Sequence, residues 1–563
     1  MKNKKLVVSI SILCLLIVLY IGTFAYYRIV RNGNIQANMG TFSFNVSHNN
    51  ETFASINLAD TIESSLSSNG YISPGSSGKF DLLVDASGGM TDVEYTISFN
   101  RTNVPSNMNF YLNKEKTNKI DSSKTVGGYF DSDEVVRSRT YVIYWDWPFD
   151  SDNDEDSNFQ NKDILLNVEV VGKQSAGRAI MLNGDAQEHS GVTVVGMWSS
   201  PYISIVKTIN FLNDLSDMPS SCTEENLCWD ITDAKSKYPV YHYLKQNETD
   251  TTKYDAYIVS EKKIYAPKDS SGLFELSKYE SNNYISSLES INFNNNFDTS
   301  KVTNMYAMFA TLINLNSLDV SNFVTVNVTN MSQLFYSCAA LPELDVSSFD
   351  TSKVTDMSYM FMYLKEIINL DLSSFDTSKV TDMRYMFAQC LSLTSLDLSN
   401  FNTSKVINMA SMFNRLYSIK SINLSNFDTS KVTNMGSLFQ GSAALETLDL
   451  SNFDTSNVTN MRAMFGGINA SGDMHLKEIK VSDKFVTDNV TDMLEMFRLC
   501  RYLNFTFNVT GNKVTNYTNI FSNTATDSNA KVVVNYTSET ESLVDQMIAT
   551  KSTPSNVVKG SQI

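Results

Sequence analysis

The sequence predicts a multidomain chain in which an all-β antiparallel sandwich precedes an α/β solenoid of the leucine-rich-repeat type with 26-residue coils. Apolar and polar residues alternate in short runs between residues 41 and 174, which is the period of half-buried strands. Related segments then recur every 26 residues, each with the leucine spacing of a short strand. A chain of 563 residues is also too long for a single core.

The composition favours folded domains and disfavours several functions. Hydrophobic residues make up 42% of the chain, charged residues make up 19%, and the net charge is -17. Such a chain repels phosphate backbones and anionic lipid headgroups, so nucleic acid is not expected as a partner. The histidines His48, His189, His242 and His475 are far apart in sequence, so we predict no metal site, no cofactor and no enzymatic activity.

Residues 1–30 are predicted to form a signal peptide or an N-terminal membrane anchor. An apolar run follows the basic residues that end at Lys5 and extends to about Tyr27. A signal cleavage site is expected between Ala25 and Tyr26, next to small residues. In either case the rest of the chain is expected at the cell surface or outside the cell, and this segment would be its only contact with a membrane.

The predicted β-sandwich covers residues 36–175. Its clearest period-two segments are TFSFNV (41–46), VEYTISF (93–99), YVIYWDW (141–147) and LNVEV (166–170). Turn clusters such as SPGSSG (73–78) separate them. In the segment DSDNDEDSN, Asp150, Asp152, Asp154 and Asp156 alternate, which suits either a calcium site or a solvated acidic loop.

Several segments of this domain resemble a known family. They are GTFAYY, YISPGSSGKFDLLVDASGG, NVPSNMNFY, YWDWPF and VEVVGKQ, and they are similar to the exported jelly-roll proteins typified by the biofilm-matrix protein TasA and camelysin. The resemblance implies a jelly-roll-like domain of a cell surface or matrix. Some members of that family polymerise by donating an N-terminal strand.

The repeat region is predicted to extend over residues 291–525. Its phase is marked by methionines 26 residues apart, at Met305, Met331, Met357, Met383, Met409, Met435 and Met461. Leu341, Leu344 and Val346 exemplify a strand whose alternate side chains point inward. Thr355 is expected to cap a short helix that follows the strand. The Phe and Met rows are expected to form a dry core, with Cys338 and Cys390 as buried thiols.

The repeats also resemble a family. The segments LDLSNFDTSKVTNM, WDIT and YAPKDSSGLF are similar to those of BspA-like leucine-rich-repeat surface proteins over about residues 205–560. That resemblance implies an exported, non-enzymatic protein whose solenoid contacts macromolecules of a host or a neighbouring cell. The C-terminal sequence TPSNVVKGSQI contains no recognisable wall-sorting signal, so the expected mode of attachment is not fixed.

One outward row of the predicted strands is a candidate binding face. It consists of Asp319, Asp345, Asp371, Asp397, Asn423 and Asp449. The row could be an acidic ledge for a basic partner, or a solubilising ladder paired with lysines eight positions later. We favour the ladder, since a residue that every repeat contains serves the scaffold. Specific contacts would then come from variable outward positions such as Ser392, Thr394 and Ser395.

The flanking regions are predicted to close the solenoid. Residues 176–290 should hold a connector and an N-terminal cap, in which Cys222 and Cys228 could form a disulfide or remain free thiols. Residues 526–563 should form the C-terminal cap, with a strand at 531–536 and a helix at about 539–550.

The predicted function is that of an exported, non-enzymatic, adhesin-like binding protein. Its partner would be an extracellular protein or a glycan. The alternative is a structural subunit of a biofilm matrix that self-assembles through the N-terminal sandwich.

Overall fold

The computed structural model of this chain describes residues 26–29, 45–47, 55–64, 73–87, 93–101, 104–112, 114, 116, 119–120, 126–130, 137–148, 164–174, 179–181, 198, 202, 204–233, 235–280, 283–468 and 474–563. The chain divides into two compact units, Met1–Gly177 and Arg178–Ile563. Ala25, His48, His189 and the acidic loop from Asp150 to Asp156 lie outside the described residues. Tyr26 begins the first described strand.

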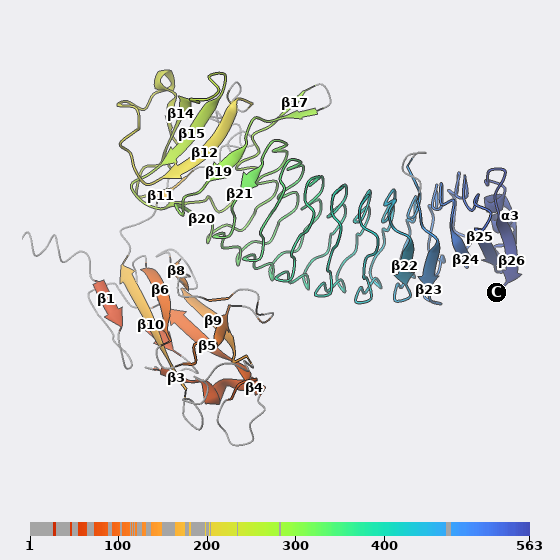
Figure 1. The fold of residues 1–563 in the computed structure, drawn as a ribbon, viewed down its shortest axis with the longest axis horizontal. Helices are drawn as coiled ribbons and strands as arrows, with labels where there is room; N and C mark the ends of the chain where they lie inside the picture. The colour runs from red at the N-terminus through yellow and green to blue at the C-terminus, as the bar shows by residue number, and fades with distance from the viewer. Residues whose placement is uncertain are drawn as a thin grey trace, which may run out of the picture. The chain divides into compact units, whose positions relative to one another are not determined.

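The first unit contains two antiparallel sheets (Figure 1). One sheet has the order β1 (Tyr26–Ile29), β10 (Leu165–Gln174), β6 (Val93–Asn100) and β8 (Val126–Phe130), with β3 (Ser55–Asn57) also paired to β10. The other has the order β2 (Asn45–Ser47), β5 (Ser77–Asp85), β9 (Ser138–Asp146) and β7 (Asn109–Tyr111), with β4 (Ile62–Ser64) also paired to β5. The short helix η1 (Leu58–Thr61) lies between β3 and β4.

Both sheets contribute to one apolar core. Phe80 and Leu82 from β5 belong to the same buried cluster as Tyr95 and Ile97 from β6. These residues alternate along their strands with exposed or half-buried ones, as a sheet with one covered face requires. The indole N–H of Trp145 donates to Thr61 Oγ1 at 2.8 Å, which satisfies the polar atom of a fully buried ring.

The second unit begins with a mixed sheet. Its order is β13 (Cys228–Asp230), β14 (Tyr241–Gln246), β15 (Tyr254–Val259), β12 (Val206–Leu212), β19 (Ser290–Asn292) and β21 (Ser317–Leu318). The first three strands pair antiparallel, and all pairings from β15 to β21 are parallel. The sheet therefore joins the antiparallel pair β14 and β15 to the first coils through β12 and β19. A second parallel sheet contains β11 (Ala179–Ile180), β16 (Ile264–Tyr265) and β20 (Phe297–Asp298), and β17 (Lys278–Glu280) pairs with β18 (Asn283–Ile285).

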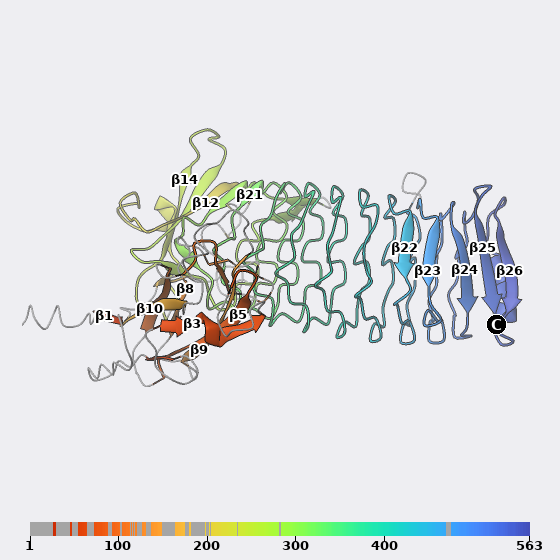
Figure 2. The same cartoon turned by 60° about the horizontal axis from the view of Figure 1, so that its bottom comes forward.

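Turn-rich coils follow and lie side by side along the unit (Figure 2). Parallel bridges connect equivalent residues of successive coils, beginning with Asp269 to Asn304 and ending with Asp492 to Asn516. Most of these bridges join residues 26 positions apart, for example Asn330 and Asp356. Each coil therefore supplies hydrogen-bond partners to its two neighbours at a fixed register.

The C-terminal end is a five-stranded parallel sheet. Its order is β22 (Thr447–Leu450), β23 (Glu478–Val481), β24 (Asn504–Val509), β25 (Lys531–Tyr536) and β26 (Val557–Gln562). The helix α3 (Glu541–Ile548) contacts β25 and β26 and buries Val544 and Met547.

The predicted fold class, a sandwich joined to an α/β leucine-rich-repeat solenoid, is wrong. Within the described ranges α3 is the only α-helix, and the chain is almost entirely strands and turns. The spacing of Met357, Met360 and Phe361 imitates a helical face. Met360 N–H does bond back to Met357 O at 3.2 Å, but Phe361 N–H donates to Met386 O in the next coil at 3.0 Å. A helix cannot form when these donors are used between coils.

Backbone conformation also explains why the predicted helix does not form. Tyr359 and Tyr363 have φ values of 59° and 67°, in the left-handed region that interrupts an α-helix. Thr355, predicted to cap a helix, instead donates its backbone N–H to Thr329 O at 2.9 Å. The predicted leucine strands form only at the two ends of the stack, because no strand occurs among the described residues between β21 and β22.

The predicted burial of the repeat residues is confirmed. The seven phase-marking methionines, from Met305 to Met461, are each 0% exposed, and Leu341, Leu344 and Val346 are also buried. Within the residues that the structure covers, no helix has both the length and the apolar character needed to cross a membrane.

Candidate functional site

The six candidate binding residues lie in one exposed row. Each of them accepts a hydrogen bond from the backbone N–H of the serine two positions later, at 2.9 to 3.1 Å. The residues are Asp319, Asp345, Asp371, Asp397, Asn423 and Asp449. This contact is an Asx turn, in which the side chain replaces a backbone acceptor at a corner. The row therefore has a structural task in every coil.

The protonation of the row follows from these turns. Hydrogen bonds from Ser399 lower the pKa of Asp397, and hydrogen bonds from Ser451 lower the pKa of Asp449. The lysine row does not neutralise them: Lys353 Nζ donates to Asn327 Oδ1 at 3.0 Å. Among the described residues, no aspartate of the row forms an ion pair with a lysine eight positions later.

A buried threonine row links adjacent coils, and the sequence reasoning missed it. Thr403 is 1% exposed; its Oγ1 donates to Asp428 O at 2.9 Å and accepts from Asp428 N–H at 2.8 Å. Equivalent pairs of bonds are made by Thr299, Thr325, Thr351, Thr377 and Thr429. The invariant threonine of the FDTS segments was the available signal.

Aromatic rings stack along the interior. Phe387 lies between Phe361 at 5.8 Å and Phe413 at 6.1 Å, with interplanar angles of 9° and 6°. The other phenylalanine row, which includes Phe401, tilts against this stack, with the Phe401 ring 6.5 Å from that of Phe387. The parallel stack is thus formed by the phenylalanine that follows methionine in each MF pair.

The repeat cysteines are inert thiols. Cys338 and Cys390 are buried, and their Sγ atoms donate to Phe309 O at 3.0 Å and Phe361 O at 3.1 Å. Burial raises the pKa of each thiol to about 12. A group with so little thiolate at neutral pH is a poor nucleophile and a poor metal ligand.

In the N-terminal part of the second unit, Cys222 and Cys228 form a disulfide. The nearby His242 is fully buried between Trp198 and Trp229, whose ring centroids are 5.8 and 5.4 Å from the imidazole. Burial lowers the pKa of His242 to about 4, so the ring is neutral at pH 7.

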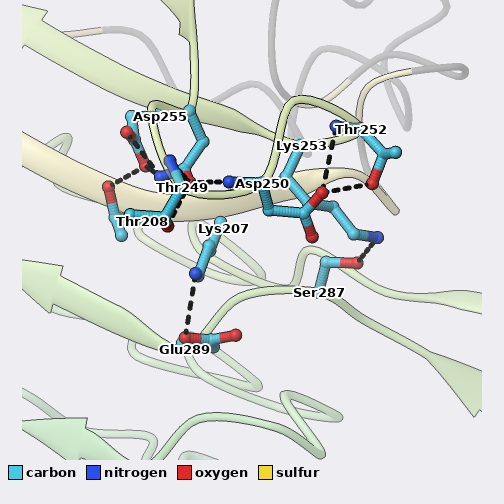
Figure 3. A network of polar contacts seen from close by, with 10 residues as sticks. Lys207, Thr208, Thr249, Asp250, Thr252, Lys253, Asp255, Ser287 and Glu289 are labelled. Carbon is cyan, nitrogen blue, oxygen red and sulfur yellow. Dashed lines mark hydrogen bonds and ion pairs between the residues drawn. The ribbon is translucent and has the colours of Figure 1, made fainter.

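A polar network fixes the loop between β14 and β15 (Figure 3). Asn247 Nδ2 donates to the Asp255 carboxylate at 2.9 and 3.0 Å, and Asn247 Oδ1 accepts from the backbone of Asp250 at 2.8 Å. Lys253 Nζ reaches Ser287 Oγ at 2.5 Å, across to the segment before β19. These groups satisfy one another, so the network positions the loop and offers no reactive group.

Tyrosines gather on one wall of the first coils, and the sequence reasoning did not identify them. We call Tyr306, Tyr336, Tyr359, Tyr363 and Tyr385 the tyrosine wall. Tyr359 and Tyr385 are stacked at 4.8 Å with an interplanar angle of 8°, and Tyr336 meets Tyr359 and Tyr363 edge-on at 6.4 and 6.2 Å. Tyr306 is 39% exposed and the other four are half-buried.

Polar groups border the tyrosine wall. Gln333 Nε2 donates to Tyr306 Oη at 3.1 Å, and Lys365 lies over the Tyr363 ring at 5.6 Å. Arg384 lies over Tyr359 at 5.8 Å and pairs with Asp382, with Nε and Oδ2 3.3 Å apart. Burial raises the pKa of Tyr336 to about 12 and also raises that of Tyr359, so these phenols remain protonated donors at neutral pH.

No group of three or more His, Cys, Asp and Glu side chains in the described ranges is arranged to hold a metal ion. The tyrosine wall combines half-buried aromatic rings with polar groups at its border, which are suited to non-covalent contact.

Comparison with known proteins bears on the repeats alone. The family model described as "Mycoplasma protein of unknown function, DUF285" matches residues 281–363, 338–423 and 417–535. Comparisons with curated proteins and with solved structures gave no match. The coil region of this chain is therefore similar to a repeat family that carries no assigned function.

Proposed function

We propose that this chain is an exported, non-enzymatic binding protein whose coil stack contacts an extracellular macromolecule. The observation that carries the proposal is the contrast between the interior and the outer walls of the coils. Interior positions recur in every coil as Phe, Met, Leu and Thr. The tyrosine wall, by contrast, is confined to the first four coils, so it is not part of what each coil needs to fold.

Two further features support an extracellular location. The disulfide Cys222–Cys228 suits an oxidising compartment. The apolar N-terminal run behind Lys5 has the composition of an export segment.

The test is retention of the labelled full chain on extracellular matrix, on intact cells and on albumin. We expect retention on matrix or cells and none on albumin. Changing the five outward aspartates to asparagine should leave retention unchanged, because asparagine preserves the Asx turns. Absence of retention on every biological surface would contradict the proposal.

Electron microscopy of the purified chain tests the alternative function, that of a self-assembling matrix subunit. Strand β1 pairs with β10 on one side, so within the described residues it is an edge strand. Ordered fibres of the purified chain in electron micrographs would favour this alternative, and monomers that are retained on matrix would favour the binding protein.

A further inference from the structure

Coils with a residue of the tyrosine wall and coils without one have the same backbone conformation. Tyr359 and Tyr385 have φ values of 59° and 57°, and the equivalent Ser411 and Ser437 have 57° and 56°. The N–H groups of Tyr385 and Ser411 both donate to the next coil at 2.9 Å. The coil conformation is therefore the same with tyrosine or with serine at this position.

Tyrosine is unfavourable at a position with positive φ. A residue with a large side chain is disfavoured in the left-handed region, where its Cβ comes close to the backbone. The chain nevertheless places tyrosine at three such positions, Tyr359, Tyr363 and Tyr385, on adjacent coils. In exchange, a half-buried phenol provides both a flat apolar face and a hydrogen-bonding group.

The tyrosine wall ends at Tyr385, whose ring is covered by another aromatic ring on one face. Tyr359 is the one aromatic ring in contact with Tyr385 among the described residues, and it covers a single face of Tyr385. The next coil offers Ala410 and Ser411 at the matching positions, and these side chains are too short to cover the other face. A flat ring of a ligand could therefore stack against Tyr385.

We propose that the tyrosine wall binds a neutral linear glycan, with its sugar rings against the tyrosines and its hydroxyls bonded to the phenols and to Gln333. This inference rests on the proposed binding function and names the partner class. Adjacent coils are about 4.8 Å apart, a step close to the length of one pyranose unit. One sugar ring would lie on the outer face of Tyr385, and the neighbouring units would contact the edges and hydroxyls of the other tyrosines, on adjacent coils.

The charges on this wall favour a neutral partner. Arg384 is already paired with Asp382, and the whole chain carries a net charge of -17, which disfavours a polyanionic glycan.

The backbone and the rings disfavour a peptide. Every backbone N–H from residue 357 to residue 363 has an acceptor within the protein, so an extended peptide has no donors with which to pair. A proline-rich helix needs slots between aromatic rings. Tyr359 and Tyr385 are in contact at 4.8 Å and leave no slot between them.

The test is electrophoresis of the full chain through native gels that contain a β-linked glucan, an α-linked glucan or a mannan. Retardation by at least one of these polymers is expected, because stacking does not require charge. The double variant Tyr359→Ser/Tyr385→Ser should weaken binding on the order of tenfold, since two aromatic contacts are lost. Serine is the residue that this chain itself places at the equivalent positions 411 and 437.

Two further variants separate binding from folding. Tyr385→Phe keeps the ring and should retain most of the binding, whereas Tyr385→Ser should weaken binding, though by less than the double variant does. Tyr417→Ser changes a tyrosine that is 43% exposed and lies outside the tyrosine wall, and should have no effect. Thermal unfolding of each variant verifies the fold.

Several results would overturn the inference. They are no retardation by any neutral polymer, equal binding by the double variant, or tyrosine-dependent binding of a proline-rich peptide or heparin in place of the neutral polymers. If the chain is retained on matrix while no neutral polymer retards it, the glycan inference fails and the binding function stands.

Discussion

The antiparallel unit Met1–Gly177 and the coil stack bury their cores in different ways. In the antiparallel unit each contact occurs once, as with the Trp145 indole that donates to Thr61 at 2.8 Å. In the coil stack the same contact recurs, as with the stacked phenylalanines around Phe387. The difference teaches that the stack contains its own controls, because a position can be compared with its equivalents in the same molecule.

Loss of a large buried ring should have the greatest effect in either unit. We expect Phe387→Ala and Trp145→Ala each to lower the free energy of unfolding of their own unit by about 3 to 5 kcal/mol, from lost burial and the cavity left behind. Calorimetry should show two transitions, of which each variant shifts one. The exposed Ile407, changed to alanine, is the control and should change stability by less than about 0.5 kcal/mol. A shift of both transitions by either variant would contradict independent units.

The second prediction concerns pH. Unfolding exposes His242 and returns its pKa from about 4 toward 6.5, so the unfolded state takes up a proton at higher pH than the folded state. Stability of the second unit should therefore fall as the pH decreases from about 6.5 to 4, by about 3 kcal/mol in total. His242→Gln should remove this dependence when denaturation is followed across the same pH range. An unchanged pH profile in the variant would show that other groups cause it.

The third prediction compares two threonines. Thr403→Val removes two hydrogen bonds to the backbone N–H and C=O of Asp428, which should cost about 1 to 3 kcal/mol. Thr381→Val removes a single bond to Thr355 O at 3.2 Å from an exposed side chain, and should cost less. Chemical denaturation measures both. Equal losses would mean that the buried row does not connect the coils more strongly than the exposed one.

The smallest effect is expected in the acidic row. Asp397→Asn retains an oxygen that can accept from Ser399 N–H, so stability should change by less than about 0.5 kcal/mol. Asp397→Ala removes the acceptor and should be the more destabilising of the two. A larger loss in the asparagine variant would indicate that the charge itself matters.

The repeat period and the buried side chains could be predicted from the sequence. The 26-residue spacing of the methionines, from Met305 to Met461, identified one interior row, and that row is buried. Apolar spacing alone cannot separate a helix from a series of turns, because i, i+3 and i+4 positions meet in both. The left-handed conformations of Tyr359 and Tyr363 decide between them, and neither residue signals such a conformation in the way that glycine does.

The candidate site was predictable in part. The row containing Asp397 was placed outward as expected, but its Asx turns were not foreseen as its main contacts. The tyrosine wall was missed because its members occupy different positions of different coils: Tyr336 lies five residues after its methionine, and Tyr359 lies two after its own. Only the stacking of coils brings them together.

The fixed register between coils has a consequence for the length of the protein. Thr381 N–H meets Thr355 O, and Ile407 N–H meets Thr381 O, each at 2.9 Å. Because each coil presents the acceptors that the previous one presented, removal of residues 371–396 would join Leu370 to Asp397 with every donor still facing a suitable acceptor. The molecule can therefore grow or shrink in whole 26-residue increments, and the reach of its walls is adjustable without a new fold.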